Sequence, residues 1–357
     1  MESLTELLDY KLKIDLELAK FFAGIHLEYD QLSTFTTSFI KNLQEFTMRG
    51  GKRLRPALLY HSYRMFNKTN LEKVQKLSIF IELIQSFLLI HDDIMDKSEL
   101  RRGDITIHKL YGQFATENNY QDKENFGNSM GILLGDLANQ LAIQIITNSE
   151  FEDSKKLQLL GLIFKEISAV IFGQAHDILY SLRTDYTIED IMFVHYYKTA
   201  KYTYEIPIIS GAMLAGASVN QLNILRKYSK SAGIAFQIHD DILGIFGDDE
   251  ITGKPTLSDI SEGKHTLLTF IANQKANVED KKILKEYIGK KDITHIEAEQ
   301  IKKIIVNTGS LEYSTIIAQE YVKLAQDSLV ELKNEINNEV SWQFISDMAK
   351  YAVSRNI

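Results

Sequence analysis

The amino-acid sequence predicts an all-α protein in which long helices surround a central cavity. The chain has 357 residues but only three prolines, Pro56, Pro207 and Pro255, so long stretches contain no helix-breaking residue. Apolar residues recur at spacings of three and four, for example between Leu77 and Leu88, which is the pattern of a packed helix. The alternation of apolar and polar residues that a half-buried strand needs is hard to find over more than four residues. We therefore expect little or no sheet.

The helical pattern is longest over residues 71–96, 151–180 and 220–243. These segments exceed the mean α-helix length of about 11 residues. Clusters of Gly, Asp, Asn and Thr interrupt the pattern and predict loops between helices. These loops are expected at residues 49–51, 102–104, 116–128 and 247–264.

The composition is that of an ordinary globular protein, with 45% apolar and 25% charged residues. It excludes a disordered or collagen-like chain. No Pro-, Gly- or Ser-rich linker divides the sequence, so we expect residues 1–357 to form a single domain. The formal net charge of -8 argues against a nucleic-acid partner, because surfaces that bind nucleic acid are usually basic.

The sequence contains no cysteine, which excludes disulfides, thiolate metal sites and a cysteine nucleophile. The N-terminus is charged and amphipathic, unlike a signal peptide. The longest apolar run, residues 83–90, is well short of the roughly 20 residues that span a bilayer. We expect a cytoplasmic protein without a transmembrane segment, and peripheral membrane contact is left open.

A first acidic motif lies at the end of the expected helix 71–96. Asp92 and Asp96 are four residues apart and project from one helix face. Asp93 is rotated from Asp92 by about 100° around the helix axis. Mg²⁺ commonly binds one or two carboxylates together with substrate phosphates. An isolated motif of this length is more often a solvated acidic helix end. Here an apolar segment precedes the acids, where unpaired charge is costly, so a cation is expected beside them.

A second acidic pair, Asp240 and Asp241, again follows an apolar helical run, residues 232–238. If both helices face one cavity, the two motifs could hold metal ions from opposite walls. A diphosphate would then bridge between the ions.

Basic residues stand close to the acidic motifs in the sequence. Lys52, Arg53 and Arg55 lie beside two glycines and before a predicted helix, and Arg101 and Arg102 follow the first motif. A single basic loop is usually solvated surface. The spacing is not that of a P-loop, so no nucleoside triphosphate site is indicated. Two separate basic groups suggest two diphosphates, because Arg and Lys are the side chains that bind them.

Four segments together resemble one known family, the trans-isoprenyl diphosphate synthases or polyprenyl synthetases. They are GGKRLRP at 50–56, LIQSFLLIHDDIMDKSELRRG at 83–103, YKTAKYT at 197–203 and FQIHDDILGIFGDDEITGKPTLSDISEGKHT at 236–266. Within this family the chain resembles the geranylgeranyl diphosphate synthases.

This resemblance implies an isoprenoid-synthase fold, a homodimer and a prenyltransferase that joins isopentenyl diphosphate head to tail to an allylic prenyl diphosphate. It also implies three Mg²⁺ ions per active site. By position the metal residues are Asp92, Asp96 and Asp240, with Asp93 as a close supporter. The residues implied to carry catalysis are Asp92, Asp96, Arg101, Lys198, Asp240 and Lys254.

The resemblance also assigns the substrate sites. Arg101, Lys198 and Lys254 match positions that hold the allylic diphosphate. The isopentenyl diphosphate positions are matched by Lys52, Arg55, Gln85 and Arg102. Further positions that line the cavity or support the metals are Thr199, Gln237, Asp241, Asp259 and Lys264, and Arg355 is expected near the diphosphate entrance.

The sequence departs from the family pattern at three places. The loop after Arg101-Arg102-Gly103 reads DITIH, where a Pro is frequent in the family; His108 and the helix beyond are retained, so we expect little effect. Gly244 replaces the last acid of the second DDxxD, so we expect metal binding on this side to depend on Asp240, Asp241 and Asp259. The polar segment 113–128 looks longer than usual and is expected to form a mobile surface loop.

Product length in the family depends on the side chains beneath the first acidic motif. Phe87 lies five residues before Asp92, and Leu88 occupies the next position. By family analogy a single aromatic residue indicates the twenty-carbon geranylgeranyl diphosphate, with farnesyl and farnesylgeranyl diphosphate as alternatives. Phe87 could equally be an ordinary core residue.

Two other functions use the same fold. A terpene cyclase would not need the second basic group formed by Lys52, Arg55 and Arg102. A non-catalytic regulatory subunit would have lost metal ligands, whereas both acidic motifs are intact. The sequence therefore favours the synthase.

Overall fold

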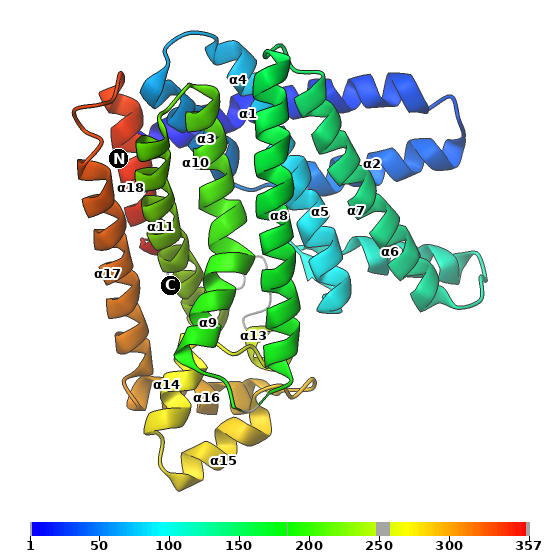
Figure 1. Ribbon diagram of the computed structural model, residues 1–357. Coiled ribbons are helices and arrows are strands. Elements are labelled where there is room, and N and C mark those ends of the chain that lie inside the picture. Colours follow the sequence, from blue (N-terminus) through cyan, green and yellow to red (C-terminus); the bar gives the residue numbers. More distant parts are fainter. Residues whose placement is uncertain (1, 184, 248–257, 355–357) are drawn as a thin grey trace.

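The computed structural model describes residues 2–183, 185–247 and 258–354, and this part of the chain is almost entirely helical (Figure 1). The all-α prediction is confirmed. The sheet in the described residues is an antiparallel hairpin of two strands with two residues each, β1 (Leu100–Arg101) and β2 (Asp104–Ile105). Arg102 and Gly103 turn the hairpin with positive φ angles of 55° and 76°.

The helices of the first half of the chain include the one that carries the first acidic motif. They are α1 (Glu2–Tyr29), α2 (Thr34–Met48), α3 (Leu54–Phe66), α4 (Leu71–Ser78), α5 (Phe80–Met95), α6 (Ile107–Glu117), α7 (Lys123–Thr147) and α8 (Asp153–Ser181).

The second half begins with α9 (Ile188–Val194), which continues into a π-helical stretch, η1 (His195–Glu205), and then α10 (Ile206–Leu214). The helix with the second acidic motif follows, and helices of the C-terminal region pack around its ends. They are α11 (Val219–Phe246), α13 (Ser258–Glu262), α14 (Leu267–Lys275), α15 (Val278–Tyr287), α16 (His295–Asn307), α17 (Ser310–Val330) and α18 (Glu339–Val353).

Two expected boundaries were wrong. The expected helix 71–96 is divided at Ile79, which ends α4 and begins α5. The expected loop 116–128 shrinks to residues 118–122, because α6 extends to Glu117 and α7 starts at Lys123. The expected mobile loop over 113–128 was wrong for the same reason. Gly127 lies inside α7 and is needed for packing, since a Cβ at this position would lie 2.2 Å from the carbonyl oxygen of His108 on α6. The small residues of this segment serve close packing of α7 on α6.

The core consists of two clusters of buried apolar side chains. The larger one includes Ile14 of α1, Phe80 of α5 and Phe344 of α18. The second joins α11 to α14 and α16 through residues such as Ile238 and Ile301. Helix α11 contributes to both clusters, and Figure 1 shows it beside α17 and α18 on one side of the molecule, with α5 and α7 on the other.

Two helices, α7 and α8, are apolar and long enough to cross a membrane by length and composition alone. Of the residues in their most apolar windows, 39% and 33% are buried in the molecule. A helix of a soluble protein can pass the same test. The expectation of a chain without a membrane span stays a prediction.

Buried histidines make the fold sensitive to acid. His61 is 1% exposed and stacks on Phe344 at a centroid distance of 3.7 Å, and burial lowers its pKa to about 3. Below pH 6.5 this ring is protonated in the unfolded chain but stays neutral in the folded chain. The free energy of unfolding therefore falls as the pH falls towards 3. We expect roughly 2 kcal/mol of this loss between pH 7 and pH 5. Urea unfolding of His61→Leu at both pH values should show that much less loss than the unaltered chain; an equal loss in both would contradict the assignment.

Candidate active site

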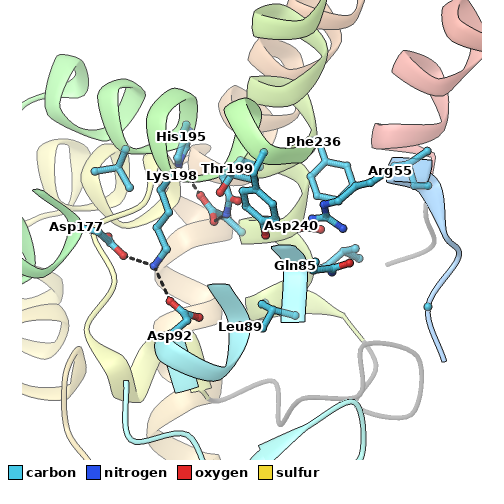
Figure 2. A pocket seen from close by; sticks show the side chains of 18 of the residues that line it. Arg55, Gln85, Leu89, Asp92, Asp177, His195, Lys198, Thr199, Phe236 and Asp240 are labelled. Carbon is cyan, nitrogen blue, oxygen red and sulfur yellow. Dashed lines mark hydrogen bonds and ion pairs between the residues drawn. The ribbon is translucent and has the colours of Figure 1, made fainter. Parts of the chain in front are cut away.

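A cavity of about 510 Å³ lies between α5, η1 and α11 and is closed by the segment before α3 and by β1. Figure 2 shows side chains from α3, α5, α8, η1 and α11 around it. The cavity brings together eleven of the residues predicted from the sequence, which are Lys52, Arg55, Gln85, Asp92, Asp96, Arg101, Arg102, Lys198, Thr199, Gln237 and Asp240, and it also reaches Asp241 and Lys264.

The first acidic motif divides its carboxylates between the cavity and the interior. Asp92 and Asp96 line the cavity, as their spacing of one helical turn on α5 predicts. Asp93 does not line it; it is 1% exposed and pairs with the Arg101 guanidinium. A hydrogen bond of 3.2 Å joins the same guanidinium to Asp92, so Arg101 fixes both carboxylates.

The carboxylates of the first motif crowd one another. Burial, together with the charge of Asp92, raises the pKa of Asp96 to about 6. A raised pKa means that the ionised form of the carboxyl group is poorly compensated, so a bound cation would stabilise it. The arrangement therefore attracts cations.

The second acidic motif approaches the cavity from α11. Asp240 lines the cavity, and Asp241 lies 5% exposed beside it. The Gln237 amide donates a hydrogen bond of 2.7 Å to Asp241, and the His195 ring of η1 lies 3.0 Å from the same carboxylate. Asp241 is therefore held by protein side chains, whereas Asp240 faces the cavity (Figure 2).

The acidic residues fit a magnesium site that the substrate completes. Among the described residues no three His, Asp or Glu side chains converge tightly enough to form a metal site by themselves. Asp92 and Asp96 on α5 and Asp240 on α11 nevertheless face one cavity. Mg²⁺ usually takes only one or two carboxylates and fills its other positions with water and phosphate oxygens. The donor set therefore suits Mg²⁺ bound together with a diphosphate.

Lys198 reaches across the cavity from η1. Its Nζ lies 2.5 Å from Asp177 of α8 and 3.3 Å from Asp92, as Figure 2 shows. Burial alone would lower the pKa of Lys198, but Asp92 and Asp177 raise it above the usual value. The ammonium group is thus permanently charged beside the first acidic motif.

The second basic group occupies the other end of the cavity. The Arg55 guanidinium donates to the Thr203 hydroxyl at 2.8 Å and lies 4.5 Å from the Tyr202 ring centre. Its Nε is buried and has no hydrogen-bond partner among the described residues. Burial and the nearby cations Arg53 and Arg55 lower the pKa of Arg102. This cluster of cations, with one hydrogen-bond donor unused, is suited to bind an anion.

Arg53, in contrast, is a structural residue. Its side chain is 1% exposed and lies 2.8 Å from Asp15 of α1 and 2.5 Å from Glu82 of α5. The residue has a positive φ of 52°, in the segment that presents Lys52 and Arg55. Arg53 therefore anchors this segment to two helices.

Some predicted residues lie elsewhere. Phe87 and Leu88 are partly buried against the core and do not line this cavity, whereas Leu89 does. The Phe87 ring packs edge-on against His91, 5.0 Å away. Lys254, the side chain of Asp259, and Arg355 lie outside what the structure describes.

Sequence reasoning missed several lining residues. Asp177 binds Lys198, and Gln174, three positions earlier on α8, donates to Asp92 at 3.1 Å. The signal available was their spacing of three, which places the two polar side chains on one face of α8. Further lining residues that were missed include His195, Tyr202, Phe236, His265 and Tyr351.

Comparison with known proteins identifies relatives over most of the chain. Residues 37–307 match the polyprenyl synthetase family. The geranylgeranyl diphosphate synthase of Saccharolobus solfataricus is 30% identical over 91% of this chain and 94% of its own length. The geranylfarnesyl diphosphate synthase of Aeropyrum pernix is 33% identical over 78% of this chain and 83% of its own.

A solved structure is also closely similar. It is a geranylgeranyl pyrophosphate synthase from Corynebacterium glutamicum, complexed with isoprenyl diphosphate and magnesium. The two chains share 30% identity and a TM-score of 0.92, with 98% of this chain and 99% of the other covered. With its fold, its paired acidic motifs and these relatives, the chain belongs to the polyprenyl synthetase family of prenyltransferases.

Proposed function

We propose that the protein condenses isopentenyl diphosphate with an allylic prenyl diphosphate, head to tail, to make geranylgeranyl diphosphate. One observation carries this assignment. A single cavity holds two cationic groups, one beside the acidic motifs and one around Arg55 and Arg102. Two diphosphates can therefore bind at once, whereas a terpene cyclase needs only one.

The residues near the acidic motifs bind the allylic substrate. Asp92, Asp96 and Asp240, with Asp93 in support, would hold the Mg²⁺ ions, which we propose to number three. When bound, these ions stabilise negative charge on the departing diphosphate. Lys198 and Arg101 supply further positive charge to the same group, and we assign Lys254 to it as well.

The reaction then needs no protein nucleophile. As the allylic carbon–oxygen bond breaks, its electron pair leaves with the diphosphate. The double bond of isopentenyl diphosphate attacks the allylic carbon, and a proton is lost to an oxygen of the leaving diphosphate. Thr199 and Gln237 line the cavity and present dipoles to the developing cation.

The second substrate site supplies the attacking double bond. Arg55, Arg102 and Lys52 would bind the isopentenyl diphosphate, with Gln85 beside them. Lys52 lies 4.8 Å from the Tyr351 ring centre, so the last helix, α18, borders this site. Lys264, 3.0 Å from Glu262, lies on the side of the acidic motifs.

Chromatography of the products tests the whole assignment. Full-length protein with Mg²⁺, isopentenyl diphosphate and the ten-carbon geranyl diphosphate should yield a twenty-carbon prenyl diphosphate. A fifteen- or twenty-five-carbon product would replace the geranylgeranyl assignment by one of its alternatives. Release of diphosphate without chain growth would contradict the synthase and favour a cyclase, and no turnover of either substrate would favour a regulatory subunit.

Product length is expected to depend on Phe87. Phe87→Ala removes a ring that packs against His91 one helical turn before Asp92, and so opens space beneath the first acidic motif. Products of the variant should grow by at least one five-carbon unit, measured by chromatography of the dephosphorylated alcohols. Phe35→Ala, on an exposed position of α2, is the control. Unchanged product length would mean that Phe87 is only a core residue.

We further propose that residues 1–357 form one domain, that the protein is cytoplasmic and that it works as a homodimer. The participation of α11 in both core clusters supports the single domain. Exposed apolar side chains on α8 recur about every seven residues and support a helix-to-helix contact with a second copy. They are Leu157, Phe164, Ile171, Phe172, Ile178 and Leu179.

The dimer can be tested at Phe172, which is 62% exposed. Phe172→Glu places a charge on the apolar face of α8, where burial in an interface would desolvate it. Light scattering after gel filtration should show a dimer for the unaltered protein and a monomer for the variant. Leu27→Glu, 86% exposed on α1, should stay dimeric. A monomeric unaltered protein, or a dimeric Phe172→Glu, would contradict the proposed interface.

A further inference from the structure

The stretch η1 that carries Lys198 and Thr199 is wound as a π-helix over eleven residues. Such winding is rare, is usually limited to a single turn and has poorer internal support than an α-helix. Here it joins α9 to α10 without a break. Something outside the local sequence must therefore hold its register.

Close backbone packing clamps η1 between two helices. A Cβ on Gly173 of α8 would lie 2.5 Å from the Lys198 backbone nitrogen. On the opposite side, a Cβ on Gly233 of α11 would lie 2.3 Å from the Ala200 Cβ. These contacts fix how near η1 lies to its neighbours, but smooth glycine surfaces do not by themselves fix its rotation.

A buried ionic network supplies the directional contacts. Lys201 of η1 is 8% exposed, and its Nζ donates to Glu166 of α8 at 2.6 Å and to Glu205 at 2.9 Å. Glu205 is 1% exposed and also accepts a hydrogen bond of 2.8 Å from the Tyr196 hydroxyl. Arg226 of α11 approaches Glu205 at 3.7 Å. The network thus ties η1 to α8 and reaches α11.

None of Glu166, Lys201 and Glu205 lines the cavity, so the network does not touch substrate. Burying three charges is expensive, and apolar residues of similar size often stabilise a fold as well. A well-attested use of buried polar groups is to select one register among several. Lys201 lies on η1, three residues after Lys198. Fixing Lys201 therefore fixes the register of η1.

We propose that the Glu166–Lys201–Glu205 network is a positioning device that holds η1 in its π-helical register and so aims Lys198 and Thr199 into the cavity. The proposal rests on the proposed role of Lys198 at the allylic diphosphate. If η1 rewound as an α-helix, Lys198 would rotate about the helix axis relative to Lys201. Its ammonium group would then lose its place between Asp177 and Asp92.

The test compares the Michaelis constants (KM) of the two substrates. The triple variant Glu166→Gln, Lys201→Met, Glu205→Gln keeps side-chain volume and leaves no unpaired buried carboxylate. Its KM for farnesyl diphosphate should rise at least about tenfold, because misplacing a group by about 1 Å can have effects of up to about a hundredfold. Its KM for isopentenyl diphosphate should rise by a clearly smaller factor, since Lys52 and Arg102 lie on other elements and η1 reaches this site only through the contacts of Thr203 and Tyr202 with Arg55. The single variant Lys201→Arg, which keeps the positive charge between Glu166 and Glu205, should leave both values close to those of the unaltered protein.

Three further variants separate the possible outcomes. Ile301→Ala makes a cavity in the second core cluster and lowers thermal stability without involving η1. If the triple variant raises both KM values alike, as general loosening would, or raises neither, the proposal is wrong. Should the triple variant not fold, Glu205→Gln alone leaves Lys201 paired with Glu166 and must raise the same KM selectively. Lys198→Met without effect on farnesyl diphosphate would instead overturn the proposed role of Lys198.

Discussion

Replacing Asp92 by Asn should reduce product formation by at least about a thousandfold. Asp92 lies 3.2 Å from Arg101 and 3.3 Å from Lys198, and it lines the cavity opposite the second acidic motif. An amide keeps the shape but loses the charge that would hold Mg²⁺ and that anchors both cations. Electrostatic groups of this kind contribute several kcal/mol to catalysis.

The same change should not damage the fold. The charge of Asp92 is one cause of the raised pKa of Asp96, so its removal relieves repulsion between the two carboxylates. Because the change also removes the attraction of Asp92 for Arg101 and Lys198, the two effects oppose each other, and we expect Asp92→Asn to melt close to the temperature of the unaltered protein. Product chromatography and calorimetric titration with Mg²⁺ in the presence of diphosphate measure the two effects. Asp9→Asn, exposed on α1, is the control, and activity of Asp92→Asn within tenfold of it would refute the metal assignment.

Replacing Arg55 by Met should raise the KM for isopentenyl diphosphate about a hundredfold, because charge-assisted hydrogen bonds to phosphate are among the strongest polar contacts. The Arg55 guanidinium is held by Thr203 and the Tyr202 ring and still has a buried Nε without a partner among the described residues. A preorganised donor of this kind loses little entropy when the anion binds. The KM for farnesyl diphosphate should change little.

Steady-state kinetics with each substrate varied in turn measure this selectivity. Arg64→Met is a matched control, since Arg64 lies on the same helix, α3, but pairs with Glu6 and does not line the cavity. Equal increases in both KM values for Arg55→Met would show that the two diphosphates do not occupy separate ends of the cavity.

Helical periodicity explains why much of the site could be predicted. Asp92 and Asp96 face the cavity together because their spacing places them on one side of α5. The apolar run before each acidic motif likewise predicted that both helices would be buried. These are local properties, and local sequence is sufficient to specify them.

The partners of these residues could not be predicted in this way. Asp93 is adjacent to Asp92, yet it turns from the cavity to Arg101, because β1 returns the chain to the end of α5. Asp177 meets Lys198 only because α8 packs on η1 through Gly173. Pairings between helices depend on packing at long range, which a spacing along one helix does not contain.

The sequence by itself determined that the chain is helical, that two acidic motifs lie at the ends of apolar helical runs, and that two basic groups accompany them. The tertiary structure decided which carboxylates face the cavity, that residues 195–205 wind as a π-helix, and that Lys201 is buried between Glu166 and Glu205. The physical reason is that periodicity sets the face on which a side chain lies. Only the packing of one helix against another decides what that face meets.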